Sequence, residues 1–143
     1  MLKIIKLWVP VVAWAVIIFY FSSSPGLRFY YVNNSWVYPL KVFSLKHPYA
    51  DFILRKMAHA IEYFILTFFL RRTLKGSFNL NDLYLFIYPV VLSLLYGVCD
   101  EIHKLSIANR HPGIRNLLID SIGIFGFYVI IKVFSSRQKS RLL

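Results

Sequence analysis

With 143 residues the chain has room for one domain, but 58% of its residues are hydrophobic and only 16% are charged, too little polar surface for a soluble fold. The net charge of +11 would fit nucleic-acid binding, yet the basic residues sit beside apolar runs, where they meet anionic lipid headgroups. The sequence therefore predicts a membrane protein whose partners are membrane lipids and not nucleic acid, and its single cysteine excludes an intramolecular disulfide.

Four apolar segments follow one another along the chain, at about residues 4–21, 52–70, 83–99 and 114–134. Each is close to the length that a helix needs to cross a hydrocarbon core of about 30 Å at 1.5 Å per residue. An open sheet edge is not tolerated in lipid, and four segments are too few to close a barrel of strands. The sequence therefore predicts a single all-α domain over residues 1–143, a polytopic membrane protein with four transmembrane helices.

The first segment begins like a secretory signal peptide, because Lys3 and Lys6 precede its apolar stretch. No small-residue cleavage site of the A-x-A type follows it, and further apolar segments come afterwards. We therefore expect an uncleaved membrane anchor.

The longest connection, residues 22–50, joins the first two segments and is rich in aromatic rings. These rings are Phe29, Tyr30, Tyr31, Trp36, Tyr38, Phe43 and Tyr49. Aromatic side chains favour the headgroup zone of a bilayer, so we expect this loop to lie along the membrane interface.

Basic residues mark both sides of the predicted membrane. The side of the termini carries Lys3, Lys6, Arg71, Arg72, Lys75, Lys132, Arg137, Lys139 and Arg141, and the other side carries Arg28, Lys41, Lys46, Arg55, Lys56, Lys104, Arg110 and Arg115. The positive-inside rule counts Lys and Arg near span ends, so these similar totals decide little. Because the first group lies tightly against the span ends, we place both termini in the cytoplasm. The richness in Phe, Tyr, Ile and Lys indicates a bacterial cell membrane.

Polar side chains of the last three segments fall near one membrane face, because the second and fourth segments begin on the side where the third ends. Lys56, His59 and Glu62 lie in the first turns of the second segment, while Asp100 and Glu101 follow the third. The sequence therefore predicts a polar cleft at one face, whichever side of the cell that is. The candidate cleft residues are Lys56, His59, Glu62, Tyr63, Asp100, Glu101, His103, Arg110, Asn116 and Asp120.

Helical spacing places Asp120, Gly123 and Gly126 on one line, where two glycines would let another helix approach and turn Asp120 inward. An unpaired charge in hydrocarbon costs several kcal/mol, so Glu62 and Asp120 must be protonated, paired or facing a polar cleft. Their natural basic partners by position are Arg55, Lys56, Arg110 and Arg115. Structural ion pairing and a ligand site both stay open.

Five of these residues are of types that bind divalent metals, namely His59, Glu62, Asp100, Glu101 and His103. Their spacing differs from the His-Glu-x-x-His arrangement of zinc proteases. We therefore predict no cofactor and keep a divalent metal at these residues as an alternative.

The same residues carry a family resemblance. Lys56 to Tyr63 is similar to the K-x-x-H-x-x-x-Y motif of VanZ-like membrane proteins, and Tyr96 to His103 is similar to their Y-x-x-x-D-E-x-H-Q segment. Arg110, Asn116 and Asp120–Gly123 resemble the family's closing R-x5-D-x3-N/D-x2-G pattern, and Ser24-Pro25 resembles its Ser-Pro feature. Two positions depart from the pattern, because Lys104 stands where the family usually has Gln and Asn116 stands where it has Asp.

The resemblance implies an envelope membrane protein, since the family's namesake is associated with low-level resistance to the glycopeptide antibiotic teicoplanin. Three functions fit the polar residues. The first is a non-enzymatic protein that binds an envelope lipid or a lipid-linked precursor by its headgroup, with Lys56, Arg110 and Arg115 on phosphate. The second is an intramembrane enzyme acting on a lipid-linked substrate, with or without a metal. The third is a proton-linked transporter, which would need an oligomer because four helices are few.

Overall fold

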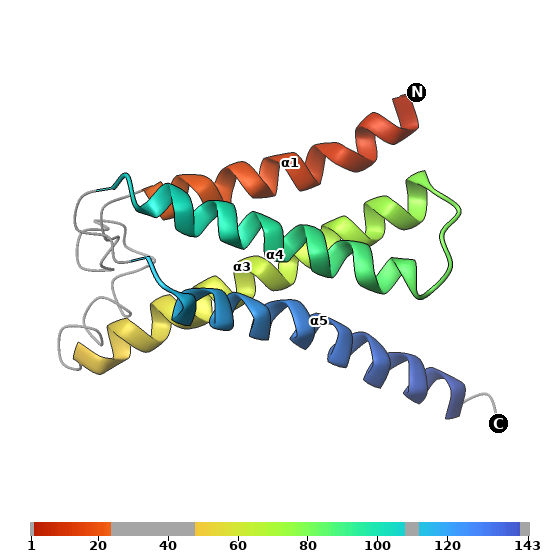
Figure 1. Cartoon of the computed structure of the whole chain (residues 1–143). Helices are drawn as coiled ribbons and strands as arrows, with labels where there is room; N and C mark the ends of the chain where they lie inside the picture. The colour runs from red at the N-terminus through yellow and green to blue at the C-terminus, as the bar shows by residue number, and fades with distance from the viewer. Residues whose placement is uncertain (1, 24–47, 108–111, 141–143) are drawn as a thin grey trace, which may run out of the picture.

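The computed structural model describes residues 2–23, 48–107 and 112–140, and within these ranges it is helical and contains no strand (Figure 1). The helices are α1 (Leu2–Ser23), α3 (Pro48–Ser77), α4 (Tyr84–Lys104) and α5 (Ile114–Ser140). This all-helical arrangement agrees with the predicted fold class. Most of the predicted aromatic loop, residues 24–47, lies outside the described residues, as do residues 108–111 with Arg110.

Three of the described helices contain segments that are long and apolar enough to cross a membrane. These segments are Ile4–Ser23, Tyr84–Lys104 and Ile114–Ser135. The helix α3 is not among them, because charged residues such as Lys56, Glu62, Arg71 and Arg72 recur along its length. Hydropathy alone therefore supports a membrane protein with three spans.

The helix α3 nevertheless occupies the centre of the bundle. It packs against α1, α4 and α5, and Figure 1 shows it crossing the bundle diagonally. Its buried positions recur every three or four residues, which is the pattern of one helical face turned inward. They are Tyr63, Leu66, Thr67, Leu70, Thr73 and Leu74. Because its neighbours are helices, α3 can carry polar groups that would be costly on a helix exposed to lipid.

The outer surface of the bundle is apolar. On α1, Val9, Val12 and Val16 are exposed along one stripe, and on α5 Leu118 and Ile122 are exposed in the same way. A contiguous apolar exterior of this kind needs a non-aqueous solvent. The polar groups of the protein therefore lie inside the bundle or at its ends, as a bilayer requires.

Hydrogen bonds between helices form near the prolines that interrupt the helical hydrogen bonding of α1 and α4. Pro89 has no N–H group, so it leaves the carbonyl of Leu85 without its usual helical donor. The hydroxyl of Tyr128 on α5 donates to that carbonyl at 3.1 Å. On α1, which contains Pro10, Thr73 Oγ1 donates to the carbonyl of Leu7 at 2.7 Å. A side chain of a neighbouring helix thus satisfies the carbonyl that Pro89 leaves free, and another donates to the backbone near Pro10.

The helices are longer than the apolar segments from which they were predicted. The third was expected to end at residue 99 but continues to Lys104, and α3 extends beyond 52–70 at both ends. Hydropathy indicates the part of a helix that lipid covers, whereas the helix itself continues until its backbone leaves the helical conformation. Asp100, Glu101 and His103 are therefore helical residues.

Candidate functional site

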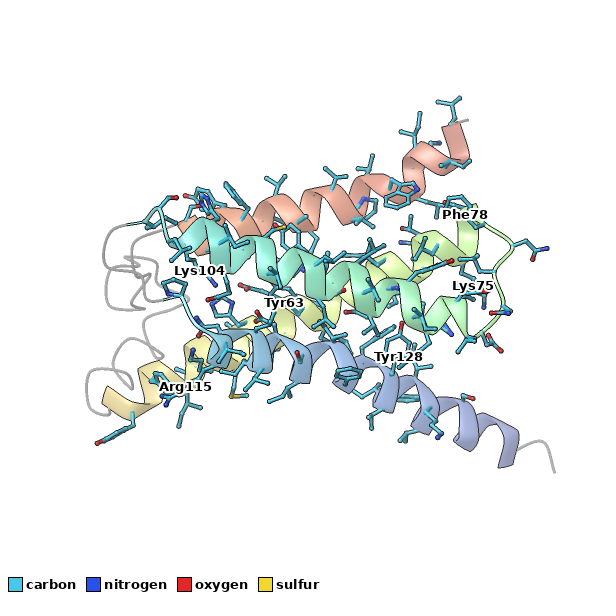
Figure 2. All side chains as sticks on the ribbon, in the orientation of Figure 1. Tyr63, Lys75, Phe78, Lys104, Arg115 and Tyr128 are labelled. Carbon is cyan, nitrogen blue, oxygen red and sulfur yellow. The ribbon has the colours of Figure 1, made fainter. Side chains whose placement is uncertain are left out.

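The C-terminal ends of α1 and α4 meet the N-terminal halves of α3 and α5 at one end of the bundle, which we call the polar end. Figure 2 shows Lys104 and Arg115 at this end and Lys75 at the opposite one. Nine of the ten predicted cleft residues belong to the portions of α3, α4 and α5 on the side of this end, namely Lys56, His59, Glu62, Tyr63, Asp100, Glu101, His103, Asn116 and Asp120. The tenth, Arg110, lies outside the described residues.

Glu101 links α4 to the beginning of α5. Its Oε1 accepts a hydrogen bond from Lys104 Nζ at 2.6 Å. Its Oε2 accepts from the backbone N–H of Gly113 at 2.7 Å and from Asn116 Nδ2 at 3.1 Å. A carboxylate in this place also interacts favourably with the positive end of the α5 helix dipole. Glu101 therefore belongs to the polar end and also joins α4 to the beginning of α5.

Lys104 is the buried cation of the polar end. Its side chain is 3% exposed, and its Nζ lies 2.7 Å from Asp100 Oδ2 as well as 2.6 Å from Glu101 Oε1. A buried ammonium needs such partners, because desolvation otherwise outweighs its interactions. The sequence interpretation left Lys104 out of the cleft. Its spacing of four from Asp100 and three from Glu101 would have revealed it, had the helix been extended past residue 99.

The network continues to α3 through Asn116. Its Oδ1 accepts a hydrogen bond from Lys56 Nζ, while its Nδ2 donates to Glu101. One connected set of side chains, from Lys56 to Asn116, Glu101, Lys104 and Asp100, thus joins three helices. The two positions that depart from the VanZ-like pattern, Lys104 and Asn116, both contact Glu101 directly. These two departures from the family pattern therefore change the charge of the same side-chain network, and not the charge of two separate sites.

His59 and Glu62 form a second pair on α3. His59 Nδ1 lies 3.2 Å from Glu62 Oε2, and the two side chains are 21% and 17% exposed. The backbone carbonyl of Glu62 also accepts a hydrogen bond from Trp14 Nε1 of α1 at 2.9 Å. This pair is a partly exposed part of the site that contains an imidazole beside a carboxylate.

His103 faces α1 and not the acidic residues. Its Nε2 lies 3.0 Å from Ser23 Oγ, and its ring stacks on Phe19 with centroids 4.3 Å apart. The structure therefore does not bring His103 together with the other candidate metal ligands. Among the described residues, no three His, Cys, Asp or Glu side chains are grouped in a way that could hold a metal ion.

Tyr63 and Asp120 lie at the bottom of the polar end. Tyr63 is 0% and Asp120 is 1% exposed, and neither the hydroxyl nor the carboxylate has a hydrogen-bond partner among the described residues. Of the basic partners expected for Glu62 and Asp120, Lys56 donates to Asn116 and Arg115 is exposed, while Arg110 and the side chain of Arg55 lie outside the described residues. Glu62 has His59 as a neighbour.

One of the two predicted glycine contacts positions Asp120. A β-carbon at Gly123 would overlap the carbonyl oxygen of Ala60, so the backbones of α5 and α3 are in direct contact there. The contact predicted for Gly126 is wrong, because a β-carbon at that position would meet nothing within 4 Å. The crossing at Gly123 lies one helical turn from Asp120 and turns this carboxylate toward α3.

Comparison with known families gives a match over almost the whole bundle. The sequence profile of the VanZ/LLP1 family matches residues 7–135, which include α1, the network residues and Asp120. Neither a curated protein nor a solved structure gives a significant match. Together with the apolar helices, the family match identifies the chain as a VanZ-like membrane protein that belongs to the VanZ/LLP1 family.

Proposed function

We propose that the polar end binds the headgroup of an envelope lipid or of a lipid-linked envelope precursor. The observation that supports this function is the network joining Lys56, Asn116, Glu101 and Lys104 at one end of an otherwise apolar bundle. If α3 crosses the bilayer as the fourth span, this end lies at the depth of the headgroups. Polar groups gathered at that depth are suited to a ligand with a polar head and an apolar tail.

The charges available at the polar end fit a phosphate-bearing headgroup. Arg115 is exposed on the first turn of α5, and Lys56 is half-buried beside Asn116. The sequence places Arg110 five residues before Arg115. Basic side chains bind phosphate oxygens through charge-assisted hydrogen bonds, while Glu62 could orient a hydroxyl or amine of the same headgroup. Asp100 and Glu101 are less available, because both are already paired with Lys104.

The opposite end of the bundle supports an orientation. Lys6, Arg72, Lys75 and Lys132 are exposed there, and Asp82 is the acid that accompanies them among the described residues. We place this end in the cytoplasm, together with both termini, because its basic residues lie close to the span ends. The polar end then faces outward, toward the compartment in which envelope precursors and glycopeptide antibiotics meet. We therefore propose that the protein, in a bacterial cell membrane, influences glycopeptide sensitivity.

The proposal is tested by native mass spectrometry of the protein in bilayer nanodiscs containing phosphatidylglycerol. The wild type should retain bound phospholipid, and Arg115→Ala should retain several-fold less. Lys132→Ala removes a similar exposed cation from the opposite end and should retain the wild-type amount. Equal retention by all three proteins would contradict headgroup binding at the polar end. In cells, Arg110→Ala should alter sensitivity to teicoplanin while the protein still inserts in the membrane.

A second candidate function is supported by the His59–Glu62 pair. A histidine oriented by a carboxylate at 3.2 Å is an arrangement used for general acid–base catalysis. The chain would then be an intramembrane enzyme acting on a lipid-linked substrate. This function requires that turnover of such a lipid by the purified protein collapses in both His59→Ala and Glu62→Gln. Product formation unchanged in these variants would exclude the pair from catalysis.

A further inference from the structure

The buried acids of the polar end outnumber its buried cations. In the described part of the chain, Asp100 of α4 and Asp120 of α5 are the buried acids of this end, and Lys104 is its buried cation. Lys104 is already shared between Asp100 and Glu101. Among the described residues, the carboxylate of Asp120 thus has no compensating charge in direct contact.

Ionised Asp120 would be an unpaired charge within the apolar span Ile114–Ser135. Such a charge costs several kcal/mol, whereas the neutral carboxylic acid costs much less and has a hydrogen to donate. The hydroxyl of Tyr63 is also fully buried without a hydrogen-bond partner among the described residues. A proton on Asp120 removes this charge.

We propose that Asp120 is a proton-binding site within the membrane, which holds a proton as a neutral carboxylic acid and exchanges it with the membrane surface through His59. This inference does not depend on what the polar end binds. It concerns a group that the headgroup proposal does not use.

His59 is the natural intermediate for exchange. It precedes Ala60, whose backbone contacts Gly123 one helical turn from Asp120, and its side chain is partly exposed beside Glu62. In the exchange step the O–H bond of Asp120 breaks and an N–H bond forms on the imidazole, which leaves a carboxylate and an imidazolium. The carboxylate of Glu62 stabilises this imidazolium. His59 then gives its proton to water at the surface.

Other charged groups facing Asp120 come from α4, namely Asp100, Glu101 and Lys104, and on α3 Glu62 lies beside His59. Lys104 and its two carboxylate partners together carry one negative charge, which disfavours a second negative charge on Asp120. The two acids of α4 therefore favour a proton on Asp120, whereas Lys104 and a protonated His59 oppose it.

Infrared spectroscopy of the protein in lipid bilayers tests the proposal. The wild type at pH 7 should show the carbonyl stretch of a protonated carboxylic acid, which shifts when the proton is replaced by deuterium. This band should disappear in Asp120→Asn, an isosteric change, and should move in frequency in Asp120→Glu. Glu101→Gln serves as the control and should keep the band. Absence of the band in the wild type, or its persistence in Asp120→Asn, would overturn the assignment.

A second measurement tests whether the proton of Asp120 is exchanged through His59. After transfer to deuterated buffer, the shift of the Asp120 band should develop several-fold more slowly in His59→Gln than in the wild type. His103→Gln, which changes the histidine facing α1, should exchange at the wild-type rate. Equal rates in the wild type and His59→Gln would remove His59 from the route.

Discussion

Gly123 of α5 lies directly against the backbone carbonyl of Ala60 on α3, with no room between them for a β-carbon. This contact sets the distance between the two helices that carry His59 and Asp120. It is therefore the packing feature on which the geometry of the polar end depends.

Replacing Gly123 by Ala should force α3 and α5 apart. Overpacking of this kind destabilises a protein by about 1–3 kcal/mol, and the loss should appear as a lower thermal midpoint in detergent or bilayer. Gly126→Ala is a matched control, because the same added carbon meets nothing within 4 Å. That variant should be neutral or slightly stabilised, since Ala favours a helix over Gly by about 1 kcal/mol. Equal effects of both changes would contradict the close crossing.

Lys104→Met should be the most destabilising change at the polar end. It leaves the buried carboxylate of Asp100 and the carboxylate of Glu101 without their shared cation. Removing one partner of a buried ion pair costs about 3–5 kcal/mol. Chemical unfolding of Lys104→Met should be compared with that of Lys132→Met, in which an exposed lysine is lost. If Lys104→Met were as stable as Lys132→Met, the proposed central place of Lys104 would be wrong.

Tyr128→Phe should weaken the bundle at Pro89. The change removes the donor of the carbonyl of Leu85, which proline has already deprived of its helical bond. A single hydrogen bond of this kind contributes about 1 kcal/mol. Tyr88→Phe changes an exposed tyrosine on the same turn as Pro89 and should leave the thermal midpoint unaltered. A loss in Tyr88→Phe equal to that in Tyr128→Phe would show that the hydroxyl of Tyr128 has no special role.

The sequence predicted the helical class and the gathering of polar residues at one end, because both depend on apolar segments and their order. It could not predict the partners within that end. Lys104 was missed because its role depends on α4 continuing past the apolar segment. His103 was grouped with the acids, but the rotation of α4 turns it toward Phe19 of α1.

The central position of α3 in the bundle also could not be predicted from the sequence. Its charges make it the least lipid-like of the four described helices, and hydropathy does not select it as a span. Its contacts with all three neighbours explain how such a helix is accommodated. Of the two glycines predicted to form a packing line, only Gly123 is in contact, because the crossing helices diverge before Gly126.

Cysteine accessibility in intact cells and in inverted vesicles, on a Cys99→Ser background, tests the central claim most directly. Single cysteines at positions 59, 103 and 115 should react with a membrane-impermeant reagent from one side of the membrane. A cysteine at position 75 should react from the other. Labelling of positions 59 and 103 from opposite sides would contradict the account, because the polar side chains of α3 and α4 would then not share a membrane face.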